Sequence, residues 1–367
     1  MSERPLTILE RLEHRVACTL LRLPPALLVR LSGKPPVVED GLTLHPEVQL
    51  LLTLRERLGA VPLSGLTPQE GRRRLRREAL VHAGERVEVA AVRDLVLDTA
   101  KGPLKARHYA PVEQSEQRPL LLFLHGGGFV LGDLETHDSA CRLLCRHAGV
   151  HVLAVDYRLA PEHPFPAALE DASAAFTWAC AHAQELGADP ARIAVGGDSA
   201  GGNLAAALSQ LAVREGIAVP SLQLLLYPAL DRTVDRASIE RFAEGFFLSR
   251  ADISWFHQHY TGASGVDCSD PRLSPLLCRE LSGLPPALVI TAGFDPLRDE
   301  GEAYAAALQA AGTPVTLRRY DGFVHGFINM TGVSPACRAA VLEIASMLRH
   351  MLEKAPAATA RGSESAA

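Results

Sequence analysis

An apolar run from Leu121 to Leu124 leads directly into His125 and three glycines, Gly126 to Gly128. Such a run has the length and composition of a buried strand. Consecutive glycines let the backbone turn sharply and leave its N–H groups uncovered. Uncovered N–H groups at a strand end can stabilise the negative oxygen that develops during acyl transfer. The segment therefore indicates one half of an acyl-transfer site and predicts a nucleophile elsewhere in the chain.

A Gly-x-Ser-x-Gly sequence from Gly197 to Gly201 supplies that nucleophile, with Ser199 at its centre. A predicted strand precedes it and a helix of small residues follows it, which is the context in which this pattern places a serine on a strained turn. Ser199 would stand at the N-terminus of the helix, and the N–H of Ala200 would face the oxyanion. A chance glycine-rich turn is the alternative, and the upstream glycines make it the weaker explanation.

A serine hydroxyl needs a base, and the base needs a carboxylate to orient it. In this setting the chain order is Ser, then acid, then His. Asp295 directly follows the predicted strand 287–291, and we favour it over its neighbour Asp299 for that reason. His325 lies between glycines after the last predicted strand, 315–319. All three residues would then lie at carboxyl ends of strands, where open α/β sheets place their sites.

Strands and helices alternate from about residue 86 onward. The predicted strands cover 87–97, 104–109, 120–124, 150–155, 192–196, 222–226, 287–291 and 315–319. The predicted helices cover 135–147, 167–186, 200–213, 300–311 and 335–354. Helices of this length between strands imply parallel pairing with right-handed crossovers, so both faces of the sheet are covered. The pattern predicts an α/β fold with a mostly parallel central sheet flanked by helices, after an initial hairpin.

Two regions interrupt this alternation. Residues 1–85 contain no convincing strand and show helical apolar spacing, and residues 231–262 carry six aromatic side chains that would either pack the cap or wall an acyl pocket. We expect both to form a helical cap over a catalytic domain that spans 86–354. The Ala/Ser/Gly-rich residues 355–367 are expected to be a disordered tail.

Residues 1–45 form an extra amphipathic segment in which arginines accompany a leucine-rich face. We favour packing of that face against the protein over contact with a membrane surface, and a homodimer contact is left open. Three groups of charged residues are expected to be structural. Asp198 is expected to bond the local backbone. Asp156, Arg158 and Glu162 are expected to form an ion-pair network, and Arg72–Arg77 are expected to form the solvated face of a helix.

Composition excludes several classes of function. A net charge of −5 gives no electrostatic case for nucleic acid. No apolar run reaches the ~18–20 residues of a membrane span, and acidic residues interrupt the N-terminus where a signal peptide would lie. The seven cysteines are odd in number and scattered, which favours reduced thiols in the cytoplasm. No metal-ligand spacing occurs, so we expect no metal.

Together these residues resemble the hormone-sensitive-lipase-like family of α/β-hydrolases, in particular its bacterial carboxylesterases. The likeness runs from about Pro46 to about Leu352. Its motifs are those described above together with Tyr157–Pro166 and Leu226–Pro228. The resemblance implies an α/β-hydrolase core with a helical cap and cofactor-independent hydrolysis of short- to medium-chain carboxylic esters. It also implies that Gly127 and Gly128 join Ala200 in the oxyanion hole, while His125 shapes the loop and is not the base.

The sequence therefore predicts a serine carboxylesterase that acts through Ser199, Asp295, His325 and an acyl-enzyme. An amidase or formamidase with the same triad, and a lipase acting at lipid surfaces, are the alternatives among enzymes. A ligand receptor that keeps the fold without catalysis is the alternative from another class, and the complete triad disfavours it.

Overall fold

The computed structural model of the protein describes residues 7–112, 117–262 and 265–354. Its large sheet has eight strands: β3 (Ala91–Thr99), β4 (Gly102–Ala110), β5 (Arg118–Leu124), β6 (His151–Asp156), β7 (Ala188–Asp198), β8 (Gln223–Leu226), β9 (Ala287–Phe294) and β10 (Val315–Val324). Their order across the sheet is β10-β9-β8-β7-β5-β6-β4-β3. β4 is antiparallel to β3 and β6, and the other pairs are parallel. The predicted mainly parallel sheet with an initial hairpin is confirmed.

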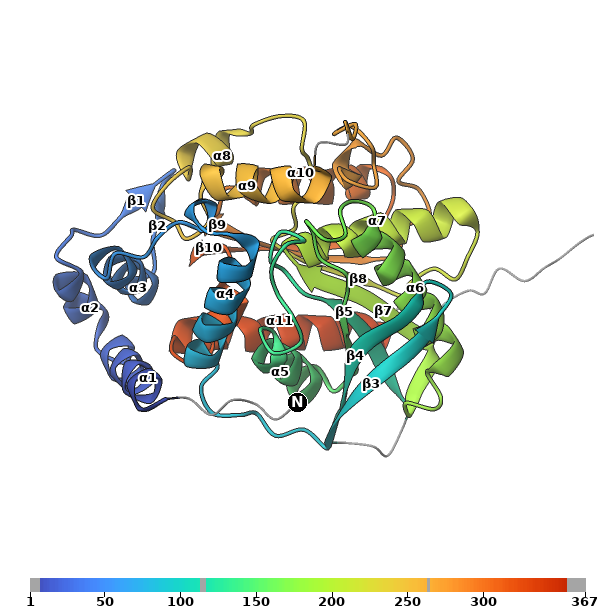
Figure 1. Ribbon diagram of the computed structural model, residues 1–367, viewed down its shortest axis with the longest axis horizontal. Coiled ribbons are helices and arrows are strands. Elements are labelled where there is room, and N and C mark those ends of the chain that lie inside the picture. Colours follow the sequence, from blue (N-terminus) through green and yellow to red (C-terminus); the bar gives the residue numbers. More distant parts are fainter. Residues whose placement is uncertain (1–6, 113–116, 263–264, 355–367) are drawn as a thin grey trace, which may run out of the picture.

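Helices cover both faces of this sheet (Figure 1). One face is covered by α5 (Asp138–Ala148) and α11 (Pro335–Lys354), and the other by α6 (Ala167–His182), α7 (Ala200–Glu215) and α10 (Arg298–Ala310). The buried side chains accordingly form two clusters, one on each face. The helices follow the predicted ranges closely because each range carries helical apolar spacing.

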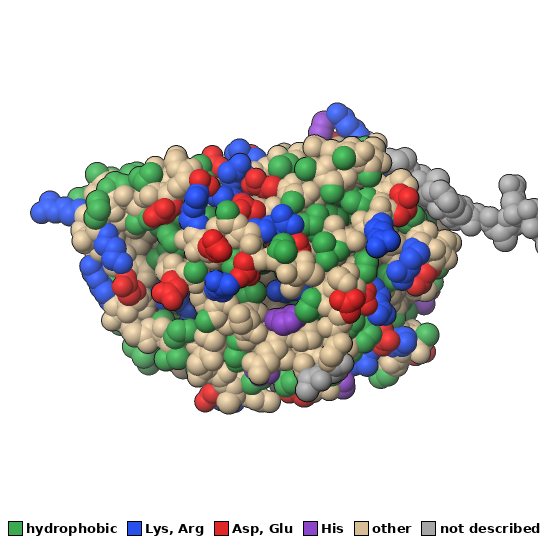
Figure 2. All heavy atoms as spheres, turned by 90° about the horizontal axis from the view of Figure 1, so that it is seen from above, with side chains coloured by type: hydrophobic (Ala, Val, Ile, Leu, Met, Phe, Trp, Pro, Cys, Tyr) green, Lys and Arg blue, Asp and Glu red, His purple; other side chains and the backbone are tan. Residues whose placement is uncertain are grey.

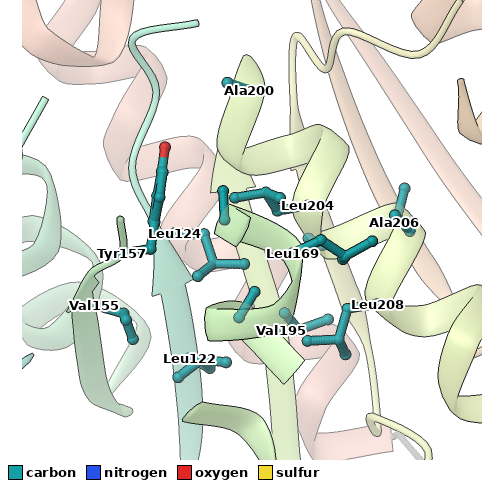
Figure 3. Packing of buried hydrophobic residues seen from close by; sticks show 14 of the residues in the cluster. Leu122, Leu124, Val155, Tyr157, Leu169, Val195, Ala200, Leu204, Ala206 and Leu208 are labelled. Atoms are coloured by element: carbon teal, nitrogen blue, oxygen red, sulfur yellow. The ribbon is translucent and has the colours of Figure 1, made fainter. Parts of the chain in front are cut away.

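The central strand β5 shows how the sequence builds both clusters. Leu122 and Leu124 belong to the α7 side, whereas Leu121 and Phe123 belong to the α11 side, and all four are fully buried. Figure 3 shows Leu122 and Leu124 beside Val195 of β7, below the helix that begins at Ala200. A strand that is buried on both faces has to be apolar at every position, which explains the continuous leucine run.

The chain order places the strand ends that matter for function. The chain passes from β5 through α5 to β6 on one side, and α6 then returns it to β7 on the other side of β5. Such a reversal opens a crevice at the carboxyl ends of the strands, where α/β sheets bind ligands. The His-Gly-Gly-Gly loop follows β5 and Ser199 follows β7, so both lie at this reversal.

Additional helices come from the two regions that interrupt the alternation. They are α1 (Ile8–Leu21), α2 (Pro25–Ser32), α3 (Pro46–Arg57) and α4 (Pro68–His82) from the first region, and α8 (Ala237–Arg241) and α9 (Arg250–Thr261) from the second. Three short 3₁₀ turns are η1 (Leu63–Gly65), η2 (Pro275–Leu277) and η3 (Phe327–Met330). Figure 1 shows α1–α3 at one end of the molecule, and α8 and α9 along its upper edge. No helix of the described ranges is long and apolar enough to cross a membrane.

The expectation that residues 1–85 contain no strand is wrong in one place. β1 (Val38–Glu39) and β2 (Leu42–Thr43) pair antiparallel as a separate small sheet. Asp40 and Gly41 connect them with φ values of 55° and 73°, as a type I′ hairpin turn requires at both central positions. Strands of two residues are too short to show an alternating pattern, so the Asp-Gly pair was their only sequence signal.

The expected burial of the leucine-rich N-terminal face is only partly correct. Leu21 and Leu28 are buried. In contrast, Ile8, Leu9 and Leu12 on α1 are exposed by 81, 70 and 56%. Apolar spacing identifies a stripe on a helix but does not determine whether another element covers it.

Two of the expected charge arrangements are also wrong. The arginines of α4 are not simply solvated, because Arg72 pairs with Glu162 at 2.6 Å and Arg76 pairs with Asp133 at 3.2 Å. Arg158 does not join Glu162 but pairs with Asp171 at 2.8 Å. These partners lie far apart in sequence or on other elements, so spacing along the chain did not indicate them.

Candidate active site

Ser199 lies on the turn between β7 and α7, in a backbone conformation that few residues other than glycine adopt. Its φ is 55° and its ψ is −114°. A Cβ atom at Gly197 would lie 2.2 Å from the carbonyl oxygen of Leu124, and one at Gly201 would lie 1.8 Å from the same oxygen. Both positions therefore require glycine, and the tight turn lifts the serine above the strand ends. Strain of this kind is typical of functional positions and costs about 1–3 kcal/mol.

The structure brings the predicted base and acid to this serine. The Nε2 atom of His325 lies 2.9 Å from the Oγ atom of Ser199, and its Nδ1 atom lies 2.9 Å from Oδ2 of Asp295. Asp295 follows β9 and is fully buried, and its other oxygen accepts the N–H of Leu297 at 2.8 Å. An imidazole that donates from Nδ1 to Asp295 presents Nε2 as an acceptor for the serine proton.

The rival carboxylate is engaged elsewhere. Asp299 accepts the backbone N–H of Ser238 at 2.9 Å and pairs with the neighbouring Arg298 at 2.9 Å. These contacts attach the start of α8 to the start of α10, so Asp299 serves as an anchor between helices. The preference for Asp295 agrees with this geometry.

The glycine loop presents backbone donors beside the serine. Gly127 and Gly128 have φ values of 116° and 62°, which are left-handed conformations that favour glycine. A Cβ atom at Gly128 would lie 2.1 Å from the ring of Phe256. The N–H groups of Gly127, Gly128 and Ala200 donate to no other group in the described part of the chain, and these residues line one pocket with Ser199. They are therefore available to a developing oxyanion.

Asp198 connects this loop to the serine turn. Its Oδ1 atom accepts the N–H of Gly126 at 2.7 Å and lies 3.1 Å from Nε2 of His137. Burial alone would raise the pKa of Asp198, but the His137 ring and the Gly126 N–H outweigh it and hold that pKa below its ordinary value. The bond to backbone was expected, but its partner lies 72 residues away, not in the local turn.

His125 is not placed to act as a base. Its Nδ1 atom bonds the carbonyl oxygen of Gly126 at 2.8 Å, and its ring stacks on Tyr157 with 4.2 Å between centroids. Burial, and then the neighbouring His137, lower the pKa of His125 to about 4. A neutral, stacked imidazole that holds the backbone of the loop fits the shaping role that was expected.

The pocket above the triad is walled by the additional helices. Leu63 and Leu75 come from the N-terminal region, and Phe247, Leu248 and Phe256 come from the region between β8 and β9. Part of the aromatic group at 242–260 thus faces the pocket, while Phe242 and Tyr260 are buried in the packing. Five polar lining residues were not identified from sequence, because no spacing or motif marks them: Arg55, Glu78, His137, Arg232 and Asn329.

A comparison with protein families decides what this fold is. The family described as alpha/beta hydrolase fold matches residues 121–329, which is more than half of the chain. The chain belongs to the α/β-hydrolase family. Within that family it is a member of the hormone-sensitive-lipase-like group, as the resemblance of its motifs predicted.

Related proteins identify the class of enzyme. The chain is 49% identical to the carboxylic ester hydrolase LipN of Mycobacterium tuberculosis over 88% of its own length and 87% of that protein. It is 38% identical to an ethyl acetate hydrolase of Pseudomonas putida, over 84% of this chain and all of that one. A solved ester hydrolase from the Lake Arreo metagenome has a TM-score of 0.82 and 42% identity, and covers 84% of this chain and 99% of its own. This α/β-hydrolase is therefore a carboxylic ester hydrolase.

Proposed function

We propose that the protein hydrolyses carboxylic esters through a Ser199–His325–Asp295 triad and a covalent acyl-enzyme. The observation that carries the proposal is the continuous hydrogen-bonded series from Asp295 through His325 to Ser199, with 2.9 Å at each step. It ends beside uncovered backbone N–H groups in one pocket. Neither the triad nor the backbone donors alone would indicate acyl transfer, because the hydroxyl needs a base and the oxyanion needs donors.

The mechanism follows from the positions of these atoms. Ser199 Oγ attacks the ester carbonyl carbon while His325 Nε2 takes the hydroxyl proton. The carbonyl electrons move to the oxygen, which the N–H groups of Gly127, Gly128 and Ala200 stabilise. Collapse of this intermediate breaks the bond to the alcohol oxygen, which takes the proton from His325. Water then attacks the acyl-enzyme by the same route and releases the acid.

The pocket supports esters with short to medium acyl chains. Gly128 is in close contact with Phe256, and a Cβ atom at Gly326, next to the catalytic histidine, would lie 3.5 Å from the ring of Phe247. Bulky rings on two sides of the serine limit the space for a long chain and exclude water from the acyl-enzyme. A panel of 4-nitrophenyl esters from acetate to palmitate tests this limit, and kcat/KM should fall steeply beyond the medium lengths.

Substitution of Ser199 tests the proposal. Ser199→Ala should remove nearly all ester turnover, by a factor on the order of a million in kcat, while the protein keeps its melting temperature. A fluorophosphonate probe should label the wild type and not the variant. Matched 4-nitrophenyl acetate and 4-nitroacetanilide distinguish an esterase from an amidase. A variant that keeps a tenth of the wild-type rate would disprove the assignment.

We also propose that the protein acts in a reducing compartment such as the cytoplasm. All seven cysteines carry free thiols, and burial raises the pKa of Cys145 and Cys337 to about 12, which keeps both as unreactive thiols. Fractionation of expressing cells, with detection of the native chain, tests this location.

A further inference from the structure

Arg232 is a cation in the active-site pocket whose side chain has no protein partner among the described residues. It lies after β8, lines the same pocket as Ser199 and is partly accessible. Seen from above, the surface of the molecule carries basic, acidic and hydrophobic side chains in mixture (Figure 2). Its backbone N–H donates to Ser274 at 2.9 Å. Its guanidinium forms no hydrogen bond and no ion pair with any residue of the described ranges. Five N–H donors of a permanent cation are thus left for something that enters the pocket.

The acidic residues near Arg232 do not neutralise it at close range. The carboxylate of Asp231 is bound by Arg236 at 2.9 Å and by Thr233 at 2.7 Å. One oxygen of Glu300 accepts the N–H of Leu230 at 2.7 Å, and the other is buried without a partner in the described part of the chain. Burial raises the pKa of Glu300 to about 8. This carboxyl is therefore largely protonated at neutral pH and is a weak counter-charge.

The second arginine of the pocket provides a contrast. Arg55 pairs with Glu78 at 3.0 Å and lies over the ring of Phe247, 4.8 Å from its centroid. Its charge is compensated by the protein, as is usual for a partly buried cation. Arg232 has no equivalent compensation within the described ranges, although Leu248, Phe256 and Leu297 line the same pocket. An unpaired cation among apolar walls costs folding free energy unless a bound ligand supplies a counter-charge.

We infer that Arg232 recognises an anionic group on the substrate, so that the preferred esters carry an ionised carboxylate in addition to the ester bond. A guanidinium binds a carboxylate through two parallel N–H bonds, and this interaction strengthens where water is excluded. The ester carbonyl lies at Ser199 while the carboxylate lies at Arg232, and the apolar walls hold the carbon chain between them. Half-esters of dicarboxylic acids have this chemistry, as do esters whose alcohol carries a carboxylate. The inference rests on the proposed function of the same site.

Chain-matched substrates test the inference. Monoethyl glutarate and monoethyl adipate are compared with ethyl pentanoate and ethyl hexanoate, in which a methyl group replaces the carboxylate. A second series compares 4-acetoxybutanoate with butyl acetate, and in this series the alcohol part of the ester carries the carboxylate. The measured quantity is the ratio of kcat/KM for the anionic ester to that for its neutral match. Arg232→Gln should lower this ratio about tenfold or more, through KM, for the series whose carboxylate reaches the guanidinium.

Two further variants act as controls. Arg232→Lys keeps the charge but loses the bidentate geometry, and should give an intermediate ratio. Arg250→Gln removes an exposed arginine that pairs with Asp235 outside the pocket, and should leave the ratio unchanged. If the ratio is the same in the wild type and in Arg232→Gln for both series, Arg232 is a structural cation and the inference is overturned.

A measurement on the wild type alone covers the case in which Arg232→Gln does not fold. Adipate should inhibit ethyl hexanoate hydrolysis at concentrations about tenfold lower than hexanoate does, because its second carboxylate has a binding group. Equal inhibition by the two acids overturns the inference. Hydrolysis of the neutral esters tests the proposed function separately, since it requires Ser199 but not an anionic substituent.

Discussion

Asp198 accepts the N–H of Gly126 at 2.7 Å, so the residue that precedes the serine holds the first glycine of the oxyanion loop. Asp198 ends β7 and Gly126 follows β5, and these two strands pair in the sheet with Leu124 opposite Gly197. The nucleophile and the oxyanion donors are thus fixed relative to one another by a side chain as well as by the sheet. The Nε2 atom of His137 lies 3.1 Å from the same carboxylate oxygen.

Removal of this carboxylate should reduce catalysis more than binding. Asp198→Ala frees the Gly126 N–H and the loop that follows it, and we expect kcat to fall about tenfold to a hundredfold, less than for loss of an oxyanion donor itself. Asp198→Asn keeps an oxygen that can accept from Gly126, and should be the milder change. Steady-state kinetics and the rate of fluorophosphonate labelling should fall in parallel. A rise in KM at constant kcat would contradict a positioning role for Asp198.

The two neighbouring carboxylates should differ sharply on substitution. Asp295→Asn would stabilise the wrong tautomer of His325, and its cost should approach the roughly 10⁴-fold known for the equivalent change in a serine protease. Asp299→Asn should weaken only the attachment of α8, because Asp299 contacts Ser238 and Arg298 and not the histidine. The comparison uses kcat on a short ester, with melting temperature as the control for folding. Greater loss of kcat in Asp299→Asn would show that the choice of acid is wrong.

The sequence predicted the sheet and the catalytic residues because their signals are local. Ser199 lies between a strand and a helix within a few residues of two required glycines, and Asp295 and His325 each follow an apolar strand. Chain order then determined which strand ends meet, because parallel strands with helical crossovers place their carboxyl ends at one edge. The distances between the three side chains are a property of the folded sheet.

The pocket walls could not be predicted in the same way. Arg232 and Glu78 follow no spacing rule, and each reaches the pocket because a helix or loop of the additional regions packs against the sheet. The pairing of Arg72 with Glu162 joins residues 90 positions apart. The helical region at the N-terminus is broken between α1 and α2, and Pro25 begins α2 at its first turn, where proline is accepted. Long-range contacts of this kind leave no periodic pattern in one sequence.

A buried histidine pair should make stability depend on acid pH. His108 Nε2 lies 3.0 Å from His151 Nδ1, and both side chains are buried between β4 and β6. Burial lowers the pKa of His108 to about 3 and that of His151 to about 4. The unfolded chain binds these protons near pH 6.5 while the native state does not, so unfolding is favoured as pH falls from about 6.5 to 4. Each histidine contributes a loss of about 1.4 kcal/mol per pH unit in that window.

Replacement of one histidine isolates this contribution from that of the carboxylates. Urea unfolding of the wild type and of His108→Gln between pH 7 and 4.5 gives the two slopes. As the pH falls, the free energy of unfolding of the variant should decrease less steeply than that of the wild type, by the slope that corresponds to about one proton. This difference in slope should hold whatever the stability of the variant at pH 7. His350→Gln changes an exposed histidine outside the pair and is the matched control. Parallel slopes for the wild type and His108→Gln would show that the pair does not titrate on unfolding.

Helix α1 should influence substrate preference through α4. Glu10 and Glu13 pair with Arg77, and His14 Nδ1 lies 2.7 Å from the carbonyl oxygen of Val81. The same helix α4 contributes Leu75 to the pocket wall. Deletion of residues 1–23 removes α1 but keeps α2, which packs on α3. We expect KM for medium-chain esters to rise severalfold, while kcat on ethyl acetate stays within a few-fold, because no residue of α1 lines the pocket that holds the triad and the oxyanion loop.

The exposed stripe on α1 provides the control for this deletion. Ile8→Ser with Leu12→Ser changes two side chains that contact little of the protein, at 81 and 56% exposure, and leaves the contacts with Arg77 and Val81 in place. This double variant should keep the full ester profile if α1 acts by supporting α4. Flotation with anionic liposomes is measured in parallel for the wild type, the deletion and the double variant. If the deletion keeps the whole profile, and it and the double variant both lose liposome binding, α1 binds a membrane surface and does not support the pocket wall.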